Sequence, residues 1–234
     1  MEYALYLLFL LAIVIATVAQ VRVSSMFHRY SRVQIASGRR AEEIALEMLR
    51  GAGLYDVRVE RVRGHLTDHY DPTARVLRLS DGVYGERTAA AIGVAAHEAG
   101  HAIQHAEGYA PLRFRTSLVP IASFASNASW ILILIGSLIM GFVGLFGGVG
   151  YYLMLAGVGL FSVTTLFQLV TLPCEFDASR RALASMEGMG YFSSRELSDS
   201  KKVLSAAAMT YVASLLVSIL QLLRLLLVLR RNDR

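Results

Sequence analysis

Two histidines and a glutamate near the middle of the chain have the spacing of a catalytic zinc site. The segment reads His97-Glu98-Ala99-Gly100-His101 and fits the pattern H-E-x-x-H. On an α-helix, residues four apart lie on one face, so both imidazoles can bind a single Zn²⁺. Glu98 then lies beside the ion, where its carboxylate can deprotonate a water. The spacing therefore predicts a zinc hydrolase with His97 and His101 as ligands and Glu98 as the catalytic base.

The rest of the chain has the composition of a membrane protein. Its 234 residues are 55% hydrophobic with a mean hydropathy of +0.48, too apolar for an ordinary soluble domain. Three stretches carry no charged side chain: residues 3–21, 116–174 and 203–223. The first can cross a ~30 Å hydrocarbon core as one helix, whereas the second, about 88 Å as a helix, needs two crossings.

Glycines mark the expected turn between those two crossings. They cluster near the middle of the second uncharged stretch: Gly144, Gly147, Gly148 and Gly150. The sequence thus predicts about four transmembrane helices, at approximately residues 3–21, 118–143, 149–172 and 203–229. The soluble catalytic parts would be residues 22–115 and 174–202. We expect a mostly α, integral membrane protein with a small α+β, zincin-like region, forming a single domain over residues 1–234.

The arginines predict the orientation in the membrane. Five follow the first apolar stretch, against a lone Glu2 before it: Arg22, Arg29, Arg32, Arg39 and Arg40. By the positive-inside tendency, both soluble parts face the cytoplasm from the inner (cytoplasmic) membrane. Arg230, Arg231 and Arg234 would then lie outside, which leaves open whether the last segment spans fully. A cleavable signal peptide at residues 1–21 is disfavoured, because this stretch begins with Glu2 and lacks the basic N-terminal region of a signal peptide.

The net charge of +5 does not require nucleic acid as a partner, because basic residues that flank membrane spans account for it. The polar segments instead predict a small fold around the motif. Ser37 is expected to cap a helix over 40–50. Alternating residues predict a strand over 55–60, and a second is expected at 75–80. Residues 87–107 are helix-compatible and carry the motif.

Several residues compete to be the third zinc ligand that a catalytic site needs. His105 lies about 12 Å along a straight helix from His97, so one ion cannot bind all three histidines of this segment. Glu107 has the position of the third ligand in metzincins, but Gln104 replaces the glycine at which their chain turns back. These nearby candidates are therefore disfavoured.

Glu175 is a better candidate, because it follows a membrane span on the expected catalytic side. It precedes helix-forming residues and two arginines, as a separate ligand helix would. The alternative is an interfacial acid paired with Arg180 or Arg181. Asp177 would point roughly to the opposite side of such a helix, so one ion should not bind both carboxylates.

Four segments carry a family resemblance: residues 67–72 (TDHYDP), 79–80 (LS), 97–104 (HEAGHAIQ) and 172–182 (LPCEFDASRRA). Together they are similar to the bacterial YugP-type neutral zinc metallopeptidases, which are small multispanning membrane proteins, and the similarity covers most of the chain. That family in turn resembles the HtpX and CAAX-prenyl endopeptidases, gluzincins whose third zinc ligand is a glutamate on a later helix. The resemblance carries this role onto Glu175.

Two positions depart from the pattern that the resemblance implies. Gluzincins commonly place an aspartate four residues after the ligand glutamate to bond a zinc histidine, and here Ser179 stands there. A serine could make a weaker bond. Cys174 replaces a small aliphatic residue, and we interpret it as a packing substitution, although its thiolate could also bind zinc.

The group that stabilises the oxyanion is less clear. His65, His69 and Tyr70 lie in the segment expected to form the strand that borders the cleft, and His69 is our candidate. The alternative is that these side chains pack or cap the turn.

These observations predict a zinc metalloendopeptidase that cleaves polypeptides, including membrane proteins, at the cytoplasmic face of the bilayer. Its strand at 75–80 would bind substrate by edge pairing. Two alternatives remain: a non-catalytic membrane protein stabilised by zinc, and a zinc hydrolase that acts on a non-peptide amide. The sequence does not predict an oligomeric state.

Overall fold

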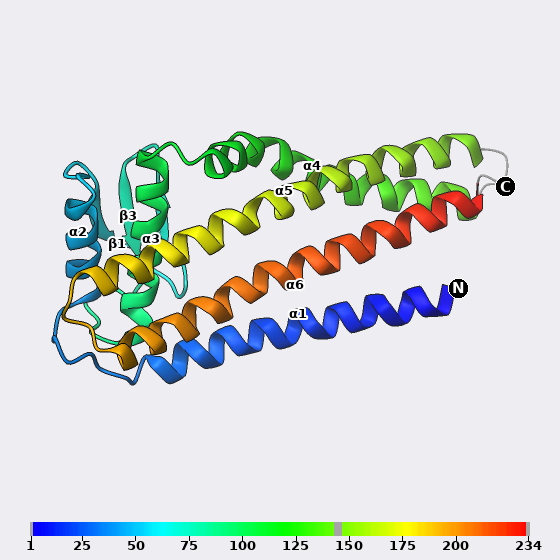
Figure 1. Ribbon diagram of the computed structural model, residues 1–234. Coiled ribbons are helices and arrows are strands. Elements are labelled where there is room, and N and C mark those ends of the chain that lie inside the picture. Colours follow the sequence, from blue (N-terminus) through cyan, green and yellow to red (C-terminus); the bar gives the residue numbers. More distant parts are fainter. Residues whose placement is uncertain (1, 143–146, 233–234) are drawn as a thin grey trace. The chain divides into compact units, whose positions relative to one another are not determined.

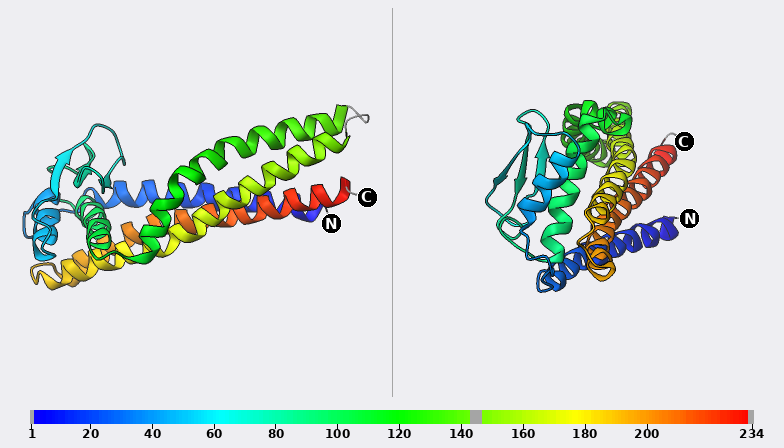
Figure 2. Two further views of the ribbon diagram at one scale, coloured as in Figure 1. Left: turned by 90° about the horizontal axis from the view of Figure 1, so that it is seen from above. Right: turned by 60° about the vertical axis from the view of Figure 1, so that its left-hand side comes forward.

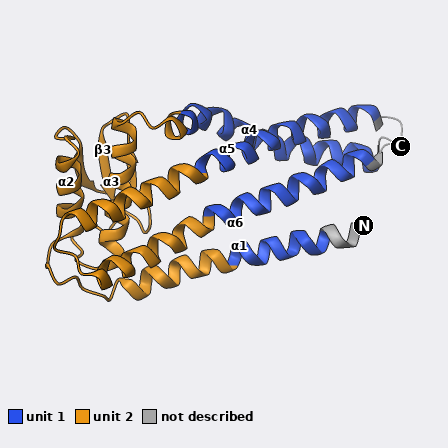
Figure 3. Ribbon diagram, in the orientation of Figure 1, with its two compact units in different colours: residues 1–17, 114–171, 211–234 blue, residues 18–113, 172–210 orange. Residues whose placement is uncertain are grey.

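The computed structural model describes residues 2–142 and 147–232, which form six helices and three short strands (Figure 1). In chain order these are α1 (Glu2–Tyr30), α2 (Ala41–Gly51), β1 (Arg58–Arg61), β2 (His69–Asp71), β3 (Val76–Leu79), α3 (Ala89–Ala106), α4 (Ala110–Phe142), α5 (Gly147–Gly188) and α6 (Ser194–Asn232). The chain divides into two compact units, coloured separately in Figure 3. Unit 1 comprises residues 1–17, 114–171 and 211–234, and unit 2 comprises residues 18–113 and 172–210.

Unit 1 contains apolar portions of four long helices. Within the described residues, four segments are long and apolar enough to cross a membrane: Tyr6–Tyr30, Ala110–Gly141, Gly148–Gly188 and Ser194–Arg230. Many of their large hydrophobic side chains are exposed, as expected for a surface that faces lipid. The predicted set of about four transmembrane helices in a mostly α protein is therefore confirmed.

In unit 1, α4 and α5 pack closely through small residues. A Cβ on Gly136 of α4 would lie 2.6 Å from the backbone nitrogen of Met154 on α5, and one on Gly157 would lie 2.9 Å from the backbone nitrogen of Ile133. These pairs run in opposite directions along the two helices, as expected for consecutive crossings joined by a turn. Of the four glycines assigned to that turn, Gly144 lies outside the described residues, and the other three belong to α5.

Unit 2 is built around a three-stranded sheet with the order β1-β3-β2. β3 pairs in parallel with β1 and antiparallel with β2, and its side chains are mostly buried. Helices α2 and α3 pack together on one side of this sheet (Figure 2). The strand predicted at 75–80 is present, but the prediction that it offers a free edge is wrong because both of its edges are paired. The strand with an open edge beside α3 is β2.

The motif helix α3 forms where the sequence predicts it. Thr88 caps its first turn by accepting a hydrogen bond from the Ala91 N–H at 3.3 Å. Gly108, with φ of +64°, follows the last turn in the left-handed conformation that ends many helices. Seven of its alanines are fully or almost fully buried: Ala89, Ala90, Ala91, Ala95, Ala96, Ala99 and Ala102.

A glycine of the motif allows α5 to approach α3 very closely. A Cβ on Gly100 would lie 2.6 Å from the carbonyl oxygen of Ala178 on α5, a distance that real side chains do not tolerate. The absence of a side chain at Gly100 therefore leaves a thin face on the motif helix. It brings the backbone of α5 to the turn that lies between the two motif histidines.

Two local predictions in unit 2 are wrong. Ser37 does not cap α2, which begins after Arg40; the backbone N–H of Arg40 donates to the Glu43 carboxylate at 2.9 Å. The strand predicted over 55–60 begins only at Arg58, because the chain is still turning after Gly53, whose φ is +77°. Tyr55 is accordingly 80% exposed rather than half-buried.

Candidate metal site

Helix α3 presents both motif histidines on one face. The ring centroids of His97 and His101 lie 4.7 Å apart with an interplanar angle of 82°. Their side chains are 15% and 12% exposed, respectively. The opposite face of the helix is fixed by its buried alanines, so the spacing of four residues converts directly into two neighbouring imidazoles.

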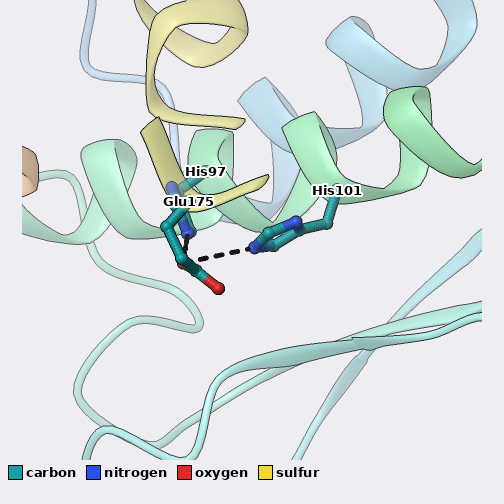
Figure 4. A group of neighbouring side chains, drawn as sticks. All are labelled: His97, His101 and Glu175. Carbon is teal, nitrogen blue, oxygen red and sulfur yellow. Dashed lines mark hydrogen bonds and ion pairs between the residues drawn. The ribbon is translucent and has the colours of Figure 1, made fainter. Parts of the chain in front are cut away.

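Glu175 reaches these imidazoles from α5 (Figure 4). Its Oε2 lies 3.2 Å from Nε2 of His97 and 3.6 Å from Nε2 of His101, and its side chain is only 3% exposed. Two ligand atoms bound to a tetrahedral zinc ion lie about 3.3 Å apart. The three side chains, whose ligand atoms all lie within 4.8 Å of one another, therefore have a spacing and chemistry that suit Zn²⁺.

The second nitrogen of His97 has a partner on α5. Its Nδ1 lies 3.1 Å from Oγ of Ser179. With Nδ1–H donating to this hydroxyl, Nε2 keeps its lone pair for a metal. The weaker bond expected from Ser179 to a zinc histidine is therefore present, with a neutral hydroxyl as the acceptor in place of a carboxylate.

Gln104 orients the other histidine in the same way. Its side-chain Nε2 donates to the Cys174 carbonyl and to the Asp177 carboxylate, both at 2.9 Å. Since both partners can only accept, the amide is fixed and its Oε1 faces Nδ1 of His101 at 3.0 Å. His101 must therefore donate from Nδ1 and keep Nε2 free on the side of Glu175.

The remaining acids of this region have partners other than the histidines. Asp177 forms ion pairs with Arg180 and Arg181. Arg181 also pairs with Glu107 at 2.6 Å, so the Glu107 carboxylate has a partner other than a metal ion. The alternative for Glu175, an ion pair with one of these arginines, is therefore wrong, because Asp177 is the acid that pairs with them. Cys174 is buried and is not part of the described metal-ligating group.

Strand β2 contacts the motif helix through Tyr70. The backbone N–H of Tyr70 donates to Oε2 of Glu98 at 3.1 Å, and its hydroxyl lies 3.1 Å from Nδ1 of His105. Burial raises the pKa of Tyr70, so the phenol stays protonated and can donate to this imidazole. His105 is thus occupied by Tyr70, one turn beyond His101.

His69 points away from this cluster. Side chains alternate along a strand, so His69 and Tyr70 face opposite sides of the sheet, and Tyr70 faces α3. The His69 ring bonds the Thr67 carbonyl at 2.8 Å and lies 3.3 Å from Arg78. The structure therefore does not bring His69 together with His97, His101 and Glu175, and this position does not support a role at the oxyanion.

The charges in the cluster favour a cation. Burial, the largest single effect, lowers the pKa of His101. The hydrogen bond that His101 donates to Glu175 and the negative charge of Glu98 together outweigh burial, so the net effect is a raised pKa of His101. Two carboxylates thus create a negative potential at the imidazoles, and a metal ion would benefit from the same potential.

Comparison with known proteins agrees with this chemistry. Residues 5–230 match the family described as "Putative neutral zinc metallopeptidase". The chain belongs to this family. The metallopeptidase is also 48% identical over 210 residues to the "Putative membrane protease YugP" of Bacillus subtilis (strain 168). These aligned residues cover 90% of this chain and 89% of that protein. No solved structure matches the chain. The resemblance inferred from the sequence is confirmed, and so are Zn²⁺ as the cofactor and the membrane as the protein's location.

Nothing in the sequence indicates that Gln104 orients His101, apart from its position three residues further along the same helix. Gln104→Leu removes the acceptor for His101 Nδ1 and should weaken zinc binding by the metallopeptidase roughly 10- to 100-fold. Competition with a fluorescent chelator measures this affinity. Gln34→Leu, the same change at an exposed position, serves as the control. Equal zinc affinity in both variants would contradict the orienting role.

Proposed function

We propose that this metallopeptidase is an endopeptidase of the gluzincin type in which His97, His101 and Glu175 hold Zn²⁺ and Glu98 is the catalytic base. The observation that carries the proposal is the group of two imidazoles and one buried carboxylate, with ligand atoms within 4.8 Å of one another. Three protein ligands leave one coordination position open, as catalytic zinc sites require.

The proposed chemistry divides between the metal and the chain. Zinc, when bound, would lower the pKa of a water and polarise the peptide carbonyl. Glu98 would accept the proton of the attacking water and deliver it to the leaving amine. The N–H of Tyr70 holds Oε2 of Glu98 at 3.1 Å, so the carboxylate is oriented and its other oxygen can meet the water.

Substrate binding would use the open edge of β2. The N–H of Tyr70 points away from β3 and toward Glu98, so this edge faces the proposed base. An extended peptide that pairs with β2 would therefore place its backbone beside Glu98. Such pairing recognises the main chain of the substrate rather than its side chains. It therefore supports broad specificity for polypeptide substrates, including membrane proteins.

The proposed location is the cytoplasmic face of the inner membrane. The uncharged residues 3–21 are followed by the arginines at positions 22, 29, 32, 39 and 40. The positive-inside tendency therefore supports a cytoplasmic position for the residues that follow α1, which include the motif helix.

Cleavage by the purified full-length protein in lipid nanodiscs tests this function. The zinc-loaded protein should cut casein or an unfolded membrane protein at internal bonds, a chelator should abolish cleavage, and added Zn²⁺ should restore it. Mass spectrometry of the fragments locates the bonds. No cleavage by zinc-loaded protein would favour a structural zinc, and release of terminal residues alone would overturn the endopeptidase assignment.

A further inference from the structure

Unit 2 contains a cavity whose chemistry is unlike that of the metal cluster. It has a volume of about 750 Å³ and lies between the C-terminal part of α1 and the N-terminal part of α6. Its lining includes Arg22, Arg29, Tyr30, Lys201, Lys202 and Met209. We call this the basic pocket, and we propose that it binds the phosphate headgroup of an anionic phospholipid.

The periodicity of the two helices creates the basic pocket. On α1, residues 22, 26 and 29 recur at intervals of four and three, and on α6 residues 198, 202, 205 and 209 do the same. Residues with this spacing share one face of a helix. Two continuous stripes therefore face each other across the cavity, and the site does not depend on a single mobile side chain.

The lining carries four cations and, among the described residues that form it, no acid. One neighbouring acid offsets part of this charge: Asp199 pairs with Lys202 at 2.8 Å. Lys202 also lies 5.6 Å from the centre of the Tyr30 ring, and Arg29 lies 5.7 Å from it, so this aromatic ring helps to hold two of the cations in place. The remaining excess of positive charge calls for an anion.

The position of the basic pocket along its helices matches the depth of lipid headgroups. Arg22 is the first charged residue after the uncharged residues 3–21, and Lys202 is the last before the uncharged residues 203–223. Both helices thus change from apolar to basic at the pocket. In a bilayer this change marks the boundary between hydrocarbon and headgroups, where lipid phosphates lie.

Apolar side chains complete the match to a lipid rather than to a free phosphate. Met26, Ala206 and Met209 line the cavity beside the cations. Met209 lies within the uncharged part of α6, on the side where the acyl chains of a bound lipid would leave. The glycerol and first methylenes of a phospholipid would be buried against these apolar side chains. A soluble phosphate compound has no apolar group to bury there and would gain no binding energy from them.

Native mass spectrometry of the full-length protein in detergent tests the proposal. The protein is titrated with phosphatidylglycerol, with phosphatidylcholine of the same acyl chains, and with glycerol 1-phosphate. Phosphatidylglycerol should bind at least about tenfold more tightly than either of the others. Arg22→Gln combined with Lys201→Gln should weaken phosphatidylglycerol binding roughly ten- to thirtyfold.

A matched double variant controls for the loss of two charges. Arg113→Gln combined with Arg230→Gln removes two arginines outside the basic pocket and should bind phosphatidylglycerol like the unmodified protein. Zinc content, measured in every variant, reports whether unit 2 is intact. Equal binding of the two lipids, or equal loss in both double variants, overturns the site; binding of glycerol 1-phosphate as tight as that of the lipid overturns the lipid as its occupant. Since no cleavage is measured, these outcomes are independent of the proposed peptidase activity.

Discussion

Replacing Glu98 by Gln should reduce cleavage of casein by at least about 10³-fold while one zinc ion stays bound. The amide keeps the size of the side chain and can still occupy the place near the Tyr70 N–H, but it cannot take a proton from water. Positioned acid–base groups contribute roughly 10²–10⁴ in rate, and here one carboxylate is assigned both proton transfers. Initial rates and elemental analysis of the same samples measure the two expected outcomes.

A glutamate at the end of the same helix provides the matched control. Glu107 pairs with Arg181 and is not among the proposed ligands, so Glu107→Gln should retain most of the cleavage rate. If Glu98→Gln cleaves as fast as Glu107→Gln, Glu98 is not the base. If it loses zinc as well as activity, the residue acts in metal binding rather than in proton transfer.

Replacing Glu175 by Ala should remove zinc and activity together. Its carboxylate is 3% exposed and faces both Nε2 atoms, so two neutral imidazoles would remain to hold a divalent ion. The loss of affinity should exceed the 10- to 100-fold typical of a residue that only orients a ligand. Dialysis against a zinc buffer followed by elemental analysis measures it.

The control for this change lies further along the same helix. Glu187 is an exposed acid of α5, and Glu187→Ala should bind zinc like the unmodified protein. Full zinc retention in Glu175→Ala would move the third ligand elsewhere. Cys174, the neighbouring thiol, would then be the first candidate.

Features that depend on local spacing could be predicted from the sequence. The uncharged stretches indicated four membrane helices because a hydrocarbon core excludes charge over a fixed length. The motif indicated two imidazoles on one face because the helix period is fixed. Glu175 could be selected as a candidate since it starts a polar helix just after a span, and the family resemblance pointed to the same residue.

Features that depend on contacts between distant segments could not be predicted. Gln104 is separated by about 70 residues from the Cys174 carbonyl and the Asp177 carboxylate that fix its amide, and nothing in its own neighbourhood indicates them. The order of the strands could not be predicted either, because β3 has the sequence of any short alternating segment and its central position depends on pairing with both β1 and β2. His69 was favoured for its chemistry alone, and strand alternation turns it away from the cluster.

X-ray absorption spectroscopy at the zinc edge of the purified, zinc-loaded protein tests the central claim most directly. The claim is that two histidines of α3 and a glutamate of α5 hold one ion, with a position left open. The expected spectrum has nitrogen and oxygen neighbours at about 2.0–2.2 Å, two of them imidazoles, and no sulfur. A sulfur neighbour at about 2.3 Å would identify Cys174 as a ligand and would contradict the open catalytic site.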